Sequence, residues 1–308
     1  MLKSVFVCLV AVSIPAIAQV SITENRDRID VVIDGQPFTS LHKGNDANKP
    51  YLYPLRSASG KPVTRGFPME QIPGESTDHP HQRSVWIGAE HVSGMDFWEN
   101  EPGSDRAHKG KIVFQRVLAM HPGKQKGDVT VVAAWVGPNG EAVLHETLTL
   151  TFYAGSGKNR LFDVDVDLKA DRKVTFEDDH DALLGLRLAT PFEESHGGVV
   201  RNAEGVTGAD HVRGTHSAWA DWQADLSGEK VGVAIMDSPK NPRHPTPWHV
   251  RPYAMIFASP FAQHDFSKDL PDGSITLEAG KDLRFRYRIL IHPADFPVAA
   301  AFKEFSAQ

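Results

Sequence analysis

One stretch of the chain, residues 78 to 98, gathers side chains that can transfer protons or bind a metal. It reads DHPHQRSVWIGAEHVSGMDFW and begins with Asp78, His79 and His81. In an extended backbone, residues two apart project to the same face, so both imidazoles can act on one ligand. Such a pair can place an acid and a base beside a sugar ring, or give two nitrogen ligands to a divalent metal. Pro80 lies between them and favours a bend or a sheet edge, which weakens the shared-face argument.

A second stretch, residues 241 to 261, combines rigidity with side chains suited to ligand recognition. It reads NPRHPTPWHVRPYAMIFASPF and presents His244, Trp248, His249 and Arg251 among five prolines. A rigid segment loses little conformational entropy when it binds a ligand, so these four side chains are candidates for a binding site. The alternative is a hydrophobic corner whose charged residues face solvent.

A third stretch is acidic and reads EDDHD over residues 177 to 181. It could bind a cation or a substrate, but a solvated turn between strands is the favoured interpretation. Tryptophans are also notable, because an aromatic face stacks on the apolar face of a sugar, although several of them must belong to the core. A cysteine or serine nucleophile is not expected, because Cys8 is the only cysteine and no Gly-x-Ser-x-Gly motif occurs.

The first eighteen residues have the features of a secretory signal peptide. Lys3 precedes an apolar run over residues 5 to 14, and Ala16-Ile17-Ala18 is a small-x-small cleavage signature. We therefore predict a signal peptide over residues 1 to 18, a periplasmic or secreted protein, and no membrane span after its removal. The net charge of −6 argues against nucleic acid and anionic membranes as partners.

The elements that must position these residues are predominantly β-strands. Residues 129–136 and 142–153 flank Pro138-Asn139-Gly140, and Asn-Gly between two apolar runs is the strongest short hairpin signal. Only residues 297–305 have a helical pattern. Many strands with few short helices predict an all-β fold, a large antiparallel β-sandwich that forms a single domain over residues 19–308.

The segment LFDVDVDL, residues 161–168, alternates strictly between apolar and acidic side chains. Its apolar residues are predicted to face the core, and its aspartates Asp163, Asp165 and Asp167 to form a solvated strand face.

Several of these motifs together resemble a known family. The segments DHPHQRSVW, DFW, HKGKIV at residues 108–113 and NPRHPTPWHVRPY resemble an exported bacterial family of unknown function labelled methane oxygenase PmoA. That family usually has His-Pro-His-His-Arg-Gly, whereas Gln82 and Ser84 replace the third histidine and the glycine here. This departure argues against a mechanism that needs a histidine at position 82. Methane oxidation is not expected, because no apolar run after the first eighteen residues is long enough to span a membrane.

The strand pattern also resembles the galactose mutarotase-like sandwiches of aldose 1-epimerases, in which histidines and a carboxylate line a shallow groove. The resemblance implies an exported carbohydrate-active enzyme, of epimerase, lyase or hydrolase type, that acts on a sugar or oligosaccharide by histidine general acid-base catalysis. No cofactor is predicted for this enzyme. The catalytic candidates are His79, His81 and His249. The substrate-binding candidates are Arg83, Trp86, Trp98, His244, Trp248 and Arg251.

Two other functions remain open on the sequence alone. In the first, His79, His81 and a histidine of the second stretch, His249 or His244, bind a divalent metal and the protein is a metal-dependent enzyme. In the second, the protein is a non-catalytic carbohydrate-binding protein. A groove with aromatic side chains but no histidine cluster would favour the binding protein. We predict that the first two stretches meet, so that His79, His81, His249 and Arg251 lie in one pocket.

Overall fold

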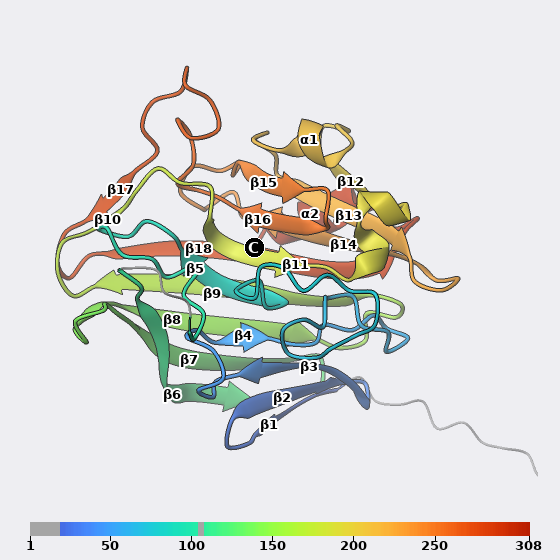
Figure 1. The fold of residues 1–308 in the computed structure, drawn as a ribbon. Helices are drawn as coiled ribbons and strands as arrows, with labels where there is room; N and C mark the ends of the chain where they lie inside the picture. The colour runs from blue at the N-terminus through green and yellow to red at the C-terminus, as the bar shows by residue number, and fades with distance from the viewer. Residues whose placement is uncertain (1–18, 104–107) are drawn as a thin grey trace, which may run out of the picture.

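The computed structural model describes residues 19–103 and 108–308, and these residues form mainly β-strands (Figure 1). Two eight-stranded sheets and one two-stranded sheet are present, and every ladder between their strands is antiparallel. This arrangement confirms the predicted all-β antiparallel class. The predicted signal peptide lies outside the described residues, and the prediction of a single domain stays a prediction.

The first sheet contains the strands that carry most of the candidate site. Its spatial order is β1 (Val20–Glu24), β2 (Arg28–Ile33), β3 (Gln36–His42), β4 (Tyr51–Leu52), β5 (Val85–Ala89), β11 (Ala182–Arg187), β16 (Met255–Ala258) and β15 (Trp248–Arg251). Strand β11 pairs with β5 on one side and with β16 on the other, so it joins three distant parts of the chain.

The second sheet is built from longer strands. Its spatial order is β12 (Val199–Asn202), β13 (Trp219–Asp225), β14 (Lys230–Asp237), β18 (Asp282–Pro293), β9 (Arg160–Ala170), β8 (Ala142–Tyr153), β7 (Lys126–Val136) and β6 (Lys111–His121). The remaining elements are β10 (Val174–Phe176), β17 (Ile275–Leu277), the helices α1 (Ala209–Val212) and α2 (Val298–Ser306), and 3-10 turns at Thr190–Phe192 and Glu194–His196. No helix within the described ranges is long and apolar enough to cross a membrane.

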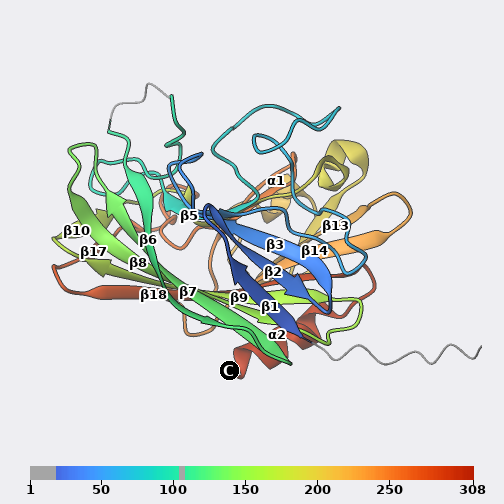
Figure 2. The ribbon, with the colours of Figure 1, turned by 90° about the horizontal axis from the view of Figure 1, so that it is seen from below.

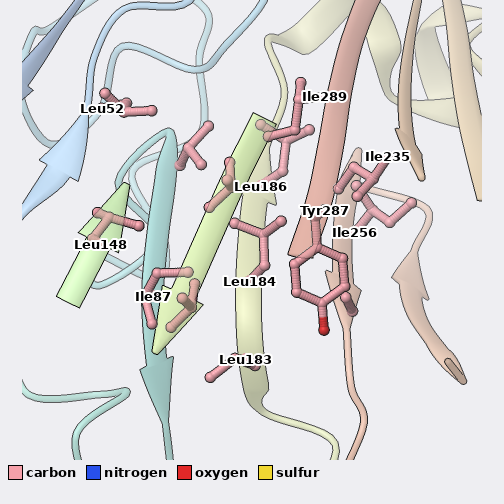
Figure 3. Packing of buried hydrophobic residues seen from close by; sticks show 14 of the residues in the cluster. Leu52, Ile87, Leu148, Leu183, Leu184, Leu186, Ile235, Ile256, Tyr287 and Ile289 are labelled. Atoms are coloured by element: carbon pink, nitrogen blue, oxygen red, sulfur yellow. The ribbon is translucent and has the colours of Figure 1, made fainter. Parts of the chain in front are cut away.

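The hydrophobic core lies between the two large sheets, whose inner faces pack against each other (Figure 2). Leu184 and Leu186 of β11 belong to the same cluster as Tyr287 and Ile289 of β18 (Figure 3). Because side chains alternate across a strand, each strand that contributes to this core presents its other residues on the outer face of its sheet. The sandwich core therefore fixes which residues of the first sheet point outward.

The predicted hairpin and helix are both present. Strands β7 and β8 pair across the turn at residues 137–141, and α2 matches the helical pattern near the C-terminus. The prediction for Asp163 is wrong, because its side chain is fully buried. Asp163 does point away from the core, but its carboxylate pairs there with Arg286 and Arg288, and the ring of Phe305 from α2 covers both guanidinium groups.

Candidate active site

A pocket of about 330 Å³ lies on the outer face of the first sheet. Its polar lining comes from five separate segments of the chain and includes His79, His81, His180, Asp181, His249 and Arg251. All four residues whose meeting the sequence predicts are in this set. Their catalytic roles stay a prediction.

Strand alternation explains how β15 and β16 contribute to the pocket. Trp248 and Val250 point into the core between the sheets, so His249 and Arg251 point outward. On β16, Phe257 pairs with His249 and also lines the pocket. The two strands thus form the floor, with an imidazole and a guanidinium group two residues apart on one face.

His79 lies in a turn before β5 and not in a strand, and its backbone is left-handed, with a φ of 45°. Its ring nonetheless meets that of His81 edge-on, with the centroids 5.6 Å apart, and stacks on Tyr253 at 5.4 Å. The Nδ1 atom of His79 lies 3.3 Å from Oδ1 of Asp78. This is within ion-pair distance, but Nδ1 of His79 is buried and forms no hydrogen bond with the described residues, so Asp78 acts on the ring by its charge.

Two buried guanidinium groups hold the turn that carries His79. Arg65 donates to Asp78 at 2.6 Å and to the carbonyl of His79 at 3.0 Å, and Arg187 donates to Gln82 at 2.7 Å. Burial alone would raise the pKa of the Asp78 carboxyl, but the charge of Arg187 and the hydrogen bond from Arg65 lower it to about 2. Asp78 therefore stays ionised, and the side chain of Gln82 is held by Arg187.

A carboxylate orients the imidazole of His180. Its Nδ1 forms a short hydrogen bond with Asp265, which leaves Nε2 as the nitrogen available to the pocket. Asp265 lies in a loop whose backbone is fixed by Asp178, because that carboxylate accepts hydrogen bonds from four backbone N–H groups, those of residues 263, 264, 265 and 273. The acidic run at residues 177–181 is therefore an organised part of the site and not the solvated turn that the sequence favoured.

His249 and Asp181 experience opposite electrostatic effects. Burial, with the nearby charges of His180, Arg213 and Arg251, lowers the pKa of His249 to about 2, so this imidazole is neutral. Burial and the neighbouring carboxylates Asp179 and Glu90 raise the pKa of Asp181. The pocket thus holds a neutral imidazole beside a carboxyl that binds its proton tightly.

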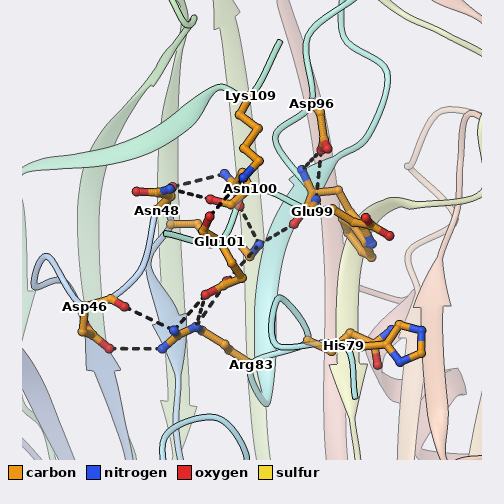
Figure 4. A network of polar contacts seen from close by, with 12 residues as sticks. Asp46, Asn48, His79, Arg83, Asp96, Glu99, Asn100, Glu101 and Lys109 are labelled. Atoms are coloured by element: carbon orange, nitrogen blue, oxygen red, sulfur yellow. Dashed lines mark hydrogen bonds and ion pairs between the residues drawn. The ribbon is translucent and has the colours of Figure 1, made fainter. Parts of the chain in front are cut away.

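Arg83 does not take the predicted substrate-binding position. Its guanidinium group is buried and donates to Glu101 at 2.8 Å and to Asp46 at 3.2 Å (Figure 4). These internal partners accept the hydrogen bonds of its N–H groups, so Arg83 is not the substrate-binding residue that the sequence predicted. His244 is also outside the pocket, where its Nδ1 donates a hydrogen bond to the carboxylate of Asp237 at 2.7 Å.

The three tryptophans predicted to stack on a sugar are buried. Trp248 belongs to the core between the sheets, while Trp86 and Trp98 pack together with Phe257 beneath the pocket. Their exposed fractions are 2% or less, so none offers a free ring face to a ligand. Their contribution is a rigid base for the site.

The structure also favours a different set of possible metal ligands from the one that the sequence predicted. The ligand atoms of His180, Asp181 and His249 all lie within 4.8 Å of one another, whereas His79 and His81 belong to no such group among the described residues. The acidic run drew attention to His180 and Asp181, but no local sequence pattern indicated that this run would lie beside His249. Arg213 also lines the pocket, but no sequence motif distinguished it from the other arginines.

Fold and site together define an all-β sandwich protein with clustered histidines, carboxylates and arginines on the outer face of one sheet. The chain belongs to the DUF6807 family, a family of unknown function, whose model matches residues 28–305. No curated protein sequence matches the chain. The resemblance to proteins labelled methane oxygenase PmoA stays a prediction.

Several solved structures are similar to this one at low sequence identity. A GalM/aldose epimerase homologue from C. elegans has a TM-score of 0.38 and 10% identity, over 90% of this chain and 100% of its own. A galactose 1-epimerase from Lactobacillus acidophilus NCFM has a TM-score of 0.37 and 8% identity, over 89% of this chain and 98% of its own. A heparan sulfate lyase HepC mutant from Pedobacter heparinus has a TM-score of 0.40 and 8% identity, over 92% of this chain but only 36% of its own. At these values the likeness carries no conclusion about activity.

Proposed function

We propose that this protein is an exported enzyme that modifies a sugar, with the pocket on the first sheet as its active site and His79 as a proton-transfer group. The observation that supports this most is the convergence of His79, His81, His180, Asp181, His249 and Arg251 in one pocket. Groups able to donate and accept protons rarely gather in a cleft without a chemical role.

The size and lining of the pocket favour a small polar substrate. A volume of about 330 Å³ is at the lower end of ligand pockets, and most of the lining side chains are hydrogen-bonding groups. Sugar hydroxyls both donate and accept hydrogen bonds, and the pocket offers donors at Arg213 and Arg251, an acceptor at Glu99, and at Asp181 a protonated carboxyl that can do both. Because the tryptophans are buried, the sugar is held mainly by hydrogen bonds and not by stacking.

His79 is suited to proton transfer because it lies in the pocket with its Nδ1 3.3 Å from the Asp78 carboxylate, a contact that can tighten into a hydrogen bond when a substrate binds. Asp78 in turn cannot move freely, since Arg65 binds its carboxylate. Arg251 is exposed and forms no ion pair within the described ranges, so it is available for an anionic or oxyanionic group of the substrate.

The test is turnover of a panel of mono- and oligosaccharides, neutral and acidic, with products identified by mass spectrometry and NMR. His79→Ala is expected to lower the rate on any substrate found by about 10²- to 10⁴-fold, the usual contribution of a general acid or base. His121→Ala is the matched control, because His121 also pairs with an aspartate, Asp128 at 3.0 Å, but lies on β6 outside the pocket.

Equal loss of activity in His79→Ala and in the control would contradict the assignment of His79. Sugar binding that persists in both variants, without turnover of any sugar in the panel, would replace the proposal with a carbohydrate-binding protein.

A further inference from the structure

We propose that His180, Asp181 and His249 form a binding site for one first-row divalent transition metal, for which zinc is the test ion. The ligand atoms of these three side chains lie within 4.8 Å of one another. Two imidazoles with one carboxylate are a common ligand set of catalytic zinc, which leaves a further position for water or substrate. This inference uses the same pocket as the proposed function but does not depend on its sugar chemistry.

The geometry requires only a small adjustment to hold an ion. Ligand atoms about 2.1 Å from a tetrahedral zinc are about 3.4 Å from one another. Side chains whose ligand atoms are already within 4.8 Å reach that separation by small rotations. All three residues line the pocket, so the remaining position of the metal would open to it.

His180 has the outer partner that metal-binding histidines usually have. Asp265 binds its Nδ1, which fixes the ring and presents Nε2. A carboxylate in this second layer orients a histidine ligand and increases its basicity. Asp178 holds the loop of Asp265 through four backbone N–H groups, so the outer layer is itself fixed.

His249 supplies an independent sign that a ligand is bound here. Its side chain is only 5% exposed, and its buried Nδ1 has no hydrogen-bond partner. Buried polar atoms in native proteins almost always have a partner, and an unpaired one requires an explanation. A polar ligand or ion held in this pocket would reduce that cost by giving the imidazole a partner.

The surrounding charges can balance a dication. Asp181 lies near the carboxylates of Asp179, Glu90 and Glu99, and Asp265 adds a further one. Two guanidinium groups, those of Arg213 and Arg251, line the same pocket on the side of His249. Carboxylates therefore outnumber the guanidinium groups around the three ligands.

Two neighbouring groups of side chains are less suitable, although their ligand atoms are equally close. In the group of Glu90, His91 and Asp179, Nδ1 of His91 already binds Oδ2 of Asp179 at 2.6 Å, and Oδ1 of Asp179 accepts from the backbone N–H of Asp181 at 2.7 Å. In the group of Asp179, His180 and Asp265, Nδ1 of His180 already forms a hydrogen bond with Asp265. A metal bound to Nδ1, or one that drew Asp265 away as a ligand, would break that hydrogen bond.

The test is zinc binding to the full chain, prepared without a histidine tag and stripped with a chelator. Titration calorimetry and elemental analysis after gel filtration are expected to give about one equivalent of zinc, and cobalt is expected to give the visible absorption of a bound ion. His180→Ala and His249→Ala are each expected to lose this equivalent. His91→Ala is the matched control and is expected to retain it, because its histidine belongs to the neighbouring group.

Circular dichroism of the stripped variants checks that each one folds. Asp265→Asn leaves all three ligands in place and is expected to weaken zinc binding by 10- to 100-fold, the usual effect of an outer-layer partner. Absence of zinc binding by the wild-type chain would overturn the proposal. So would a folded His249→Ala variant that binds zinc as the wild type does, or loss of binding in His91→Ala alone. His79→Ala is expected to keep its zinc, so a failure of the proposed catalytic role can be distinguished from a failure of the metal site.

Discussion

The buried carboxyl of Glu146 should make the stability of this protein depend on pH. This residue lies on the inward face of β8 between Leu144 and Leu148, and its side chain is almost entirely buried. Burial raises its pKa from the ordinary 4.5 to about 7, although the hydrogen bond from Trp135 at 2.9 Å opposes the change. A carboxyl whose pKa is raised on folding binds its proton more tightly in the folded state, so acid favours folding at this position.

The magnitude follows from the two pKa values. A difference of one pKa unit is worth about 1.4 kcal/mol, so ionisation of Glu146 costs the folded state roughly 3 kcal/mol at high pH. The contribution is complete below pH 4.5 and is lost as the pH rises through 7. Glu146→Gln keeps an acceptor for Trp135 but cannot ionise, so it should remove roughly 2–3 kcal/mol of the decrease in unfolding free energy between pH 5 and 8.

Urea unfolding at several pH values between 5 and 8 measures this decrease in unfolding free energy. At each pH the free energy is extrapolated linearly to zero urea, and the dependence on urea should have a similar slope throughout. Glu141→Gln is the matched control, since Glu141 lies in the turn of the same hairpin but its side chain is 68% exposed. The reasoning is refuted if Glu146→Gln and the wild type lose stability in parallel as the pH rises.

Three further substitutions test other parts of the structure. Arg83→Ala should reduce the unfolding free energy by roughly 3–5 kcal/mol, because the buried carboxylate of Glu101 then keeps only the more distant Lys49 at 3.8 Å, and a loss below 1 kcal/mol by urea unfolding would argue against that pair. Gly185→Ala should cost roughly 1–3 kcal/mol and lower the melting temperature, since its new Cβ would lie 2.5 Å from the ring of Trp86. Asp178→Ala should accelerate amide hydrogen exchange in the loop whose four N–H groups it binds, and unchanged exchange would show that the loop is held by other contacts.

Local sequence signals predicted the strands better than they predicted the environment of each strand face. The Asn-Gly turn and the apolar runs beside it determine the β7–β8 hairpin locally, so it could be predicted. Asp163 could not be placed correctly, because period-two alternation shows only that a residue faces away from the core. Whether that face meets solvent depends on α2, more than 130 residues later, whose Phe305 covers the arginines that bind Asp163.

The candidate site could be predicted in its chemistry but not in its full composition. Histidine and arginine in rigid segments indicated His79 and His249 correctly as residues of one pocket. His180 was missed because an acidic run in a loop has the same local pattern whether it is solvated or organised. The tryptophans were misplaced for a similar reason, since a ring that stacks on a sugar and a ring that packs in a core look alike in a sequence.

The position of β11 has a consequence for how this protein folds. That strand joins β5 to β16, and every ladder it forms links segments that are far apart in the chain. Proteins dominated by such non-local pairings fold slowly, because the entropy of loop closure is lost before the contacts form. The pocket needs β11, β15 and the turn before β5 at once, so it should appear only near the end of folding, and no short peptide cut from the chain should retain it.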